Sequence, residues 1–86
     1  MRINGIDLKP LGLLQRRVLV ALGLSYPGPI STEKLIEIVW PDPDLEPEHS
    51  RAGINQIATA LRSKRLNGWT VPRADSRGYR LEKVER

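Results

Sequence analysis

Apolar residues recur at helical spacing in three stretches of the chain, which predicts three helices. The first covers about residues 10–23, the second runs from Ser31 to Pro41, and the third covers about residues 48–66. One face of the third stretch follows the i, i+3, i+4, i+7, i+11 spacing, with these residues: Ile54, Ile57, Ala58, Leu61 and Arg65. The opposite face is polar and carries mainly amide and hydroxyl groups.

Local signals set the ends of the first two helices. Pro10 suits the first helical position, where a missing backbone N–H costs no hydrogen bond. Ser31 is a good N-cap, and Glu33 places a carboxylate in the first turn, where the helix dipole favours it. Pro41 ends the second helix because proline cannot continue helical hydrogen bonding. Ile30 lies between turn-forming residues and could form a very short strand.

The third helix has an ambiguous start. Pro47 could be its first residue, or Ser50 could be its N-cap. The pair Asn67-Gly68 ends it, since either residue can take the left-handed conformation found after a helix. Gly53 lies inside it and costs about 1 kcal/mol relative to alanine. That cost is either tolerated or serves the close approach of a backbone.

Alternating apolar and polar residues predict short strands on both sides of the helices. Residues 2–8 alternate around an Asn-Gly pair, which indicates a short hairpin or a single strand. Residues 69–73 and 79–84 form two further strands, and the turn-forming residues 74–78 join them into a hairpin.

This order of elements predicts an α+β chain. A short β segment in residues 1–9 precedes three helices within 10–66 and a hairpin in 69–84, all in one domain of residues 1–86. Three helices followed by a hairpin are typical of a winged helix-turn-helix. In that fold the last helix, here about 48–66, enters the major groove, and the hairpin contacts the neighbouring backbone or minor groove.

Composition argues against several classes of function. The 86 residues include no cysteine and a single histidine, His49, so neither a disulfide nor a metal site is expected. No apolar run approaches the roughly 18 residues of a membrane span, and the start lacks a signal-peptide pattern. We therefore expect a cytoplasmic protein without a membrane partner. The sequence has no paired carboxylates in a plausible cleft, no Ser/His/Asp set and no phosphate-binding glycine loop, so we expect neither an enzyme nor a cofactor.

Charge is divided unevenly along the chain. Residues 1–48 hold five Lys/Arg and seven Asp/Glu, whereas residues 49–86 hold nine Lys/Arg and three Asp/Glu. The basic half favours a polyanionic partner, most often nucleic acid, over a charge that serves solubility alone. The four aromatic residues are scattered and do not form a platform for stacking single-stranded bases.

The segment 41–48 contains three prolines and four acidic residues. Proline restricts the backbone, so this segment holds a shape at little entropic cost. It is either a rigid linker with solvated charges or an exposed contact for a basic protein surface. The candidate contact residues are Asp42, Asp44 and Glu46.

Four groups of residues occur in an order known from one protein family. They are Leu11 to Leu24; Ile30-Ser31 with Leu35 and Val39-Trp40; Ile54 and Ala58 with Leu61-Arg62-Ser63-Lys64; and Arg77-Gly78-Tyr79-Arg80-Leu81. From Pro10 to Leu81 the chain resembles the winged-helix effector domain of the OmpR/PhoB-type bacterial transcription regulators. The resemblance implies sequence-specific binding of double-stranded DNA in transcription control, with the 41–48 loop contacting RNA polymerase.

Two of the chain's departures from that family concern its first strands and its third helix. Family members usually begin with a four-stranded sheet, for which only residues 2–8 remain here. Positions of the third helix that often carry basic or histidine contacts are Ile57, Thr59 and Ala60 in this chain. The helix is therefore expected to read bases more than to hold phosphates.

Nine polar residues are the candidate DNA contacts: Arg51, Asn55, Gln56, Thr59, Arg62, Ser63, Lys64, Arg73 and Arg77. The amide edges of Asn55 and Gln56 match N6 and N7 of adenine, and an arginine such as Arg51 can bond guanine or a phosphate. The other basic residues of the set are expected to meet phosphates, with Arg77 at the hairpin tip also able to enter the minor groove.

Plainer interpretations remain for each of these residues. The polar face of the helix could be the solvated side of an ordinary amphipathic helix. Tyr79, Trp40 and Trp69 are expected in the core. The alternative function is a winged-helix module for protein interaction that contacts RNA polymerase through residues 41–48 without significant DNA binding. The sequence leaves the oligomeric state open, a dimer on DNA included.

Overall fold

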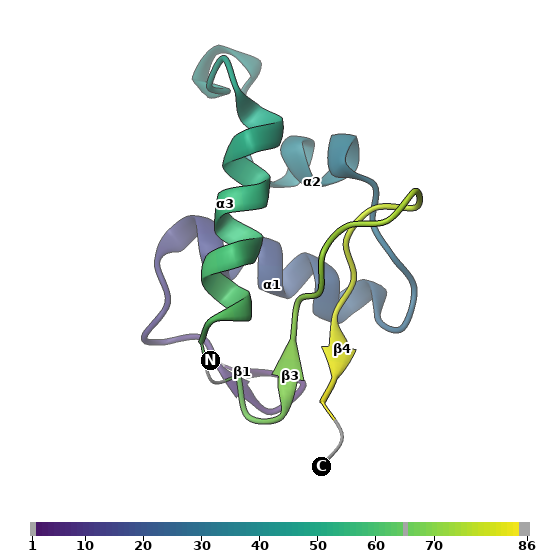
Figure 1. Cartoon of the computed structure of the whole chain (residues 1–86). Helices are drawn as coiled ribbons and strands as arrows, with labels where there is room; N and C mark the ends of the chain where they lie inside the picture. Colours follow the sequence, from purple (N-terminus) through teal and green to yellow (C-terminus); the bar gives the residue numbers. More distant parts are fainter. Residues whose placement is uncertain (1, 65, 85–86) are drawn as a thin grey trace.

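Short helices and strands follow one another along the chain in the computed structural model, which describes residues 2–64 and 66–84 (Figure 1). In order they are β1 (Arg2–Ile3), β2 (Ile6–Asp7), α1 (Leu13–Ser25), α2 (Thr32–Val39), the 3₁₀ helix η1 (Pro43–Leu45), α3 (Ser50–Arg62), β3 (Trp69–Thr70) and β4 (Glu82–Lys83). The expected α+β class is confirmed, with three α-helices within the described residues. None of the helices in these residues is long and apolar enough to span a membrane.

The first hairpin forms around Asn4 and Gly5. β1 and β2 pair antiparallel, with Ile3 opposite Ile6. Both turn residues have positive φ angles, 52° and 81°, as the tightest hairpin turns require. The hairpin therefore forms where the Asn-Gly pair indicated. Ile6 is buried, so this two-residue ladder is held against the rest of the domain.

α1 begins later than expected. The backbone N–H of Leu11 donates to the Leu8 carbonyl at 3.1 Å, which places Pro10 inside a turn. Helix α1 then starts at Leu13 after an extended Gly12. The prediction that Pro10 is the first helical residue was wrong, because Pro10 lies in this turn and the helix starts three residues later.

α2 follows its local signals closely. The Ser31 hydroxyl accepts the backbone N–H of Lys34 at 3.2 Å, which confirms Ser31 as the N-cap. Helix α2 ends at Val39, two residues before Pro41. Ile30 forms an isolated antiparallel bridge with Tyr79, which confirms the very short strand expected there.

α3 is shorter than the expected span of 48–66. It runs from Ser50 to Arg62, with His49 at the N-cap position and Ser63 at the C-cap position. Neither proposed start was right, since Ser50 is the first helical residue. Asn67 and Gly68 do take positive φ angles, 54° and 90°. They belong to the turn that leads into β3 and not to the end of the helix. Arg65 lies outside the described residues.

The second hairpin, residues 69–84, has shorter strands than expected. β3 and β4 pair antiparallel, with Trp69 opposite Lys83 and Thr70 opposite Glu82. A single bridge between Asp75 and Gly78 closes the turn at the tip. Figure 1 shows this hairpin beside α3.

The three helices contact one another pairwise and enclose the core. The apolar face expected on α3 is buried at Ile54, Ala58 and Leu61, and Ile57 packs partly against it. The hairpin contributes Val71, Tyr79 and Leu81 to the same hydrophobic cluster. The first two helices contribute further buried residues: Val18, Leu19, Leu22, Leu35 and Val39. This core fixes which side of α3 faces solvent.

Candidate nucleic-acid interface

The exposed side of α3 carries the polar residues that the sequence singled out. Arg51, Asn55, Gln56, Thr59 and Ser63 are all exposed, as is Lys64 just beyond the helix. The helix period therefore separates these residues from the buried apolar face as expected. Their hydrogen bonds divide them into groups that the sequence did not distinguish.

Arg51 is paired with an acid on the preceding helix. Its guanidinium forms an ion pair with the carboxylate of Glu33, and the two side chains are 65% and 64% exposed. The pair joins the first turn of α3 to the first turn of α2. Because it is so exposed, it contributes at most about 1 kcal/mol, and a phosphate could replace it.

Asn55 is hydrogen-bonded both to Thr59 and to Tyr79 of the hairpin. The Thr59 hydroxyl donates to the main-chain carbonyl of Asn55 at 2.8 Å. The Tyr79 hydroxyl donates to Oδ1 of Asn55 at 3.4 Å. Tyr79 itself is only 5% exposed, so its expected place in the core is confirmed. Burial raises the pKa of the Tyr79 phenol above its ordinary value of 10.0, and the charge of Arg62 opposes that rise.

Arg62 is a link between α3 and the hairpin. Its Nε donates to the Val71 carbonyl at 2.9 Å, and the residue is half-buried. One terminal nitrogen, Nη2, is buried without an acceptor among the described residues. The sequence suggested a side chain extended toward a phosphate; the structure turns it inward, against the hairpin.

Two arginines of the hairpin lie around one carboxylate. Asp75 accepts the backbone N–H of Arg77 at 2.8 Å. Its other oxygen, Oδ2, lies 3.6 Å from a guanidinium nitrogen of Arg77 and 3.6 Å from one of Arg80. The Arg77 hydrogen bond, followed by the charges of Arg77 and Arg80, holds the pKa of Asp75 below its ordinary value of 3.8. Arg73 is exposed on the same hairpin.

Arg80, Asp75 and Glu33 were missed as parts of this site. Arg80 ends the sequence Arg77-Gly78-Tyr79-Arg80, and its positive charge was the one feature of the sequence that could have indicated a place in this site. The role of Asp75 could have been read from its position two residues before Arg77, a spacing at which aspartate often accepts a backbone N–H in a turn. Nothing local to Glu33 points to Arg51.

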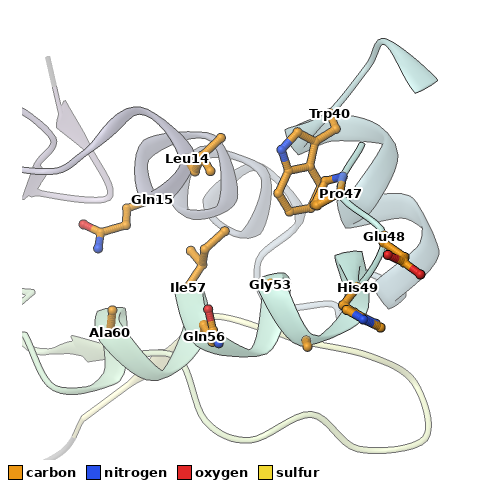
Figure 2. Close-up of a pocket in the computed structure, with 11 residues that line it drawn as sticks. Leu14, Gln15, Trp40, Pro47, Glu48, His49, Gly53, Gln56, Ile57 and Ala60 are labelled. Atoms are coloured by element: carbon orange, nitrogen blue, oxygen red, sulfur yellow. The ribbon is translucent and has the colours of Figure 1, made fainter. Parts of the chain in front are cut away.

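Gln56 lies at the edge of a groove between α1, Trp40 and α3. Figure 2 shows Ile57 pointing from α3 toward Leu14 of α1, and the Trp40 ring directed toward α3 near Gly53. The groove has a volume of about 560 Å³. A Cβ on Gly53 would stand 3.1 Å from Cη2 of Trp40, so the glycine accommodates an indole ring and not a backbone.

The acidic segment before α3 is exposed throughout residues 41–49. Asp42 Oδ1 accepts the backbone N–H of Asp44 at 3.0 Å, and Glu46 accepts the Ser50 hydroxyl at 3.1 Å. Two of the three candidate contact residues thus shape η1 and the start of α3 while their carboxylates stay at the surface. The described residues hold no cluster of three or more metal-binding side chains.

Comparison with family models, with characterised proteins and with solved structures found no match for this chain. The function must therefore be inferred from the chain's own residues.

Proposed function

We propose that this domain binds double-stranded DNA as a winged helix-turn-helix of the OmpR/PhoB type and acts in transcription control in the cytoplasm. The observation that carries the proposal is the coupling of α3 to the hairpin. Asn55 and Arg62 lie two turns apart on α3, and both are hydrogen-bonded to the hairpin, at Tyr79 and Val71. A polar helix face and a basic hairpin are thereby held as one surface, as a protein needs if it is to contact a groove and the adjacent backbone together.

The two elements have different tasks in this proposal. Residues 50–62 of α3 enter the major groove, where Asn55, Gln56 and Thr59 meet base edges. Residues 73–79 form a wing against the adjacent minor groove or backbone, with Arg73 and Arg77 on phosphates. Lys64 and Ser63 approach the backbone at the end of α3.

The existing ion pairs do not oppose this role strongly. Arg51, Arg77 and Arg80 are paired with acids in the free protein. The carboxylate partners lie at the surface, where water and salt screen the pairs, and an arginine presents five N–H donors, more than one carboxylate uses. Phosphate oxygens can therefore add to or replace these partners.

Selection of sites from a random duplex pool, followed by titration at several salt concentrations, tests the proposal. Arg77→Ala should weaken binding to all sequences and lower the salt slope by at most about 1. Lys9→Ala removes one exposed positive charge outside the proposed surface and is the matched control. A chain that selects no duplex, or an Arg77→Ala variant that binds like the control, would refute DNA binding.

A second candidate function uses the acidic segment 41–48. Its support is that the segment is both exposed and shaped by its own hydrogen bonds, and Figure 1 shows it protruding at the N-terminal end of α3. In this alternative the domain contacts RNA polymerase without significant DNA binding. Association with purified bacterial RNA polymerase that is lost in Asp42→Asn/Asp44→Asn, from a domain without duplex affinity, would favour it.

A further inference from the structure

We infer that Tyr79 is a positioning residue that presets the Asn55 side chain as a hydrogen-bond donor, so that α3 excludes cytosine at the base that Asn55 meets. The inference rests on the proposed DNA-binding function and adds a base preference to it. The geometry behind it is a buried tyrosine whose hydroxyl lies 3.4 Å from Oδ1 of an exposed asparagine.

The position of the Tyr79 hydroxyl is set by the backbone hydrogen bonds of Tyr79 and by the burial of its ring. The Tyr79 N–H donates to the Ile30 carbonyl at 2.9 Å, and the Ile30 N–H donates to the Tyr79 carbonyl at 2.8 Å. The ring is buried in the hydrophobic cluster. A side chain held at both its backbone and its ring cannot follow a mobile partner, so Asn55 is the member of the pair that is oriented.

The hydroxyl acts as the donor in this pair. The phenol is protonated at neutral pH, since its ordinary pKa is 10.0 and burial raises the pKa of Tyr79 further. The Arg62 charge acts on the same phenol and attracts its oxygen, which turns the O–H hydrogen away from Arg62. The acceptor that lies within reach is Oδ1 of Asn55.

An amide held by its oxygen presents its nitrogen on the other side. Nδ2 carries two N–H donors, and Asn55 makes no hydrogen bond from Nδ2 to any described residue. Thr59 uses the main-chain carbonyl of Asn55, so it does not compete for the side-chain amide. Asn55 therefore offers donors to whatever enters the groove beside α3.

Donors select among the four bases in the major groove. Guanine offers N7 and O6 as acceptors, adenine offers N7 and thymine offers O4, whereas cytosine offers only the N4 amino donor. The sequence suggested adenine for Asn55 because both amide edges match it. With Oδ1 engaged by Tyr79, guanine and thymine become acceptable as well, and cytosine is the base that is rejected.

Site selection with the wild type, Tyr79→Phe and Tyr26→Phe tests this inference. Phenylalanine keeps the ring and removes the hydroxyl, so the Asn55 amide can rotate and present its oxygen to cytosine. We expect one position depleted in cytosine about fivefold in the wild type, the ratio for one hydrogen bond. Tyr79→Phe should restore cytosine at that position alone. Tyr26, 42% exposed and edge-on to Trp69, is the matched control, and Tyr26→Phe should keep the wild-type profile.

Asn55→Asp provides an independent test that leaves Tyr79 unchanged. A carboxylate only accepts, so the variant should prefer cytosine where the wild type rejects it. A Tyr79→Phe profile identical to the wild type, or one altered equally at all positions, would overturn the inference while duplex binding stands. A wild-type domain that selects no duplex would overturn the proposed function first, and this inference with it.

Discussion

Replacing Gly78 by alanine should break the connection between the hairpin and the segment before α2. Gly78 has a φ of +117°, a conformation that side-chain-bearing residues rarely adopt. An added Cβ would collide with the Ile30 carbonyl oxygen and would stand 2.6 Å from the Ile30 carbonyl carbon and 2.7 Å from Cα of Ser31. All three atoms belong to the backbone, so no side chain can move aside to make room.

The cost of Gly78→Ala follows from these contacts. Separating the two segments breaks the two Ile30–Tyr79 backbone hydrogen bonds, worth about 0.5–1.5 kcal/mol each. Keeping them instead requires alanine at an unfavourable φ, at about 1–3 kcal/mol, and the collision adds to that. Because the cheaper of the two routes sets the cost, we expect a loss of about 1–3 kcal/mol, against a total stability of about 4–13 kcal/mol for a domain of this size.

Urea denaturation followed by the fluorescence of Trp40 and Trp69 measures this loss. Gly12→Ala is the control, since Gly12 has a φ of −67° and a Cβ there would meet no described atom within 4 Å. Its cost should stay near or below about 1 kcal/mol, as for other changes at a helix N-cap. A Gly78→Ala variant no less stable than Gly12→Ala would refute the argument from close approach.

Three further predictions concern the charged and titrating groups. Asp75→Asn keeps an oxygen for the Arg77 N–H but removes the charge shared by Arg77 and Arg80. Duplex titration should therefore give severalfold tighter binding, and unchanged affinity would show that the carboxylate does not compete with DNA. Glu33→Gln breaks an exposed pair and should lower the free energy of unfolding by less than about 1 kcal/mol in urea; a larger loss would contradict that estimate. Because the folded-state pKa of Tyr79 is raised, its contribution to stability is complete below pH 10 and is lost as pH rises through the folded-state pKa. Urea denaturation at increasing alkaline pH should show this loss in the wild type and less of it in Tyr79→Phe, and equal slopes would exclude Tyr79 as its source.

Elements with strong local signals could be predicted from the sequence. The Asn4-Gly5 turn and the Ser31 cap each depend on two to four consecutive residues, and both formed as expected. The start of α1 failed because Pro10 suits a turn as well as a first helical position. The hydrogen bond from the Leu11 N–H to the Leu8 carbonyl shows that Pro10 lies in a turn and not at the start of the helix.

The lengths of β3 and β4 depend on contacts that no local pattern contains. Thr70 pairs with Glu82, but at the tip Asp75 pairs with Gly78, a register shifted by one residue. Pro72, between those pairs, has no N–H to donate to a ladder. An alternating pattern predicts continuous strands, whereas the change of register limits them to two residues each.

The candidate site was predictable as a set of residues but not as a set of partners. The helical period placed the polar residues of α3 on its exposed side, except Arg62, which turns inward against the hairpin. The groups that orient them are Glu33 for Arg51, Val71 for Arg62 and Tyr79 for Asn55. These partners lie on other elements, so only the folded chain brings them together.

The hydrogen-bond and ion-pair partners of the arginines also reduce the positive charge that residues 49–86 can offer to DNA. The net charge of +6 in residues 49–86, from nine Lys/Arg and three Asp/Glu, favoured a polyanionic partner. Yet the Arg62 guanidinium is turned against the hairpin, and Arg51, Arg77 and Arg80 already have carboxylate partners. Added salt weakens those pairs as well as any phosphate contact, so the two effects partly cancel. The salt slope of duplex binding should therefore be shallower than the number of basic residues implies, and discrimination between sequences should depend mainly on the oriented polar groups of α3.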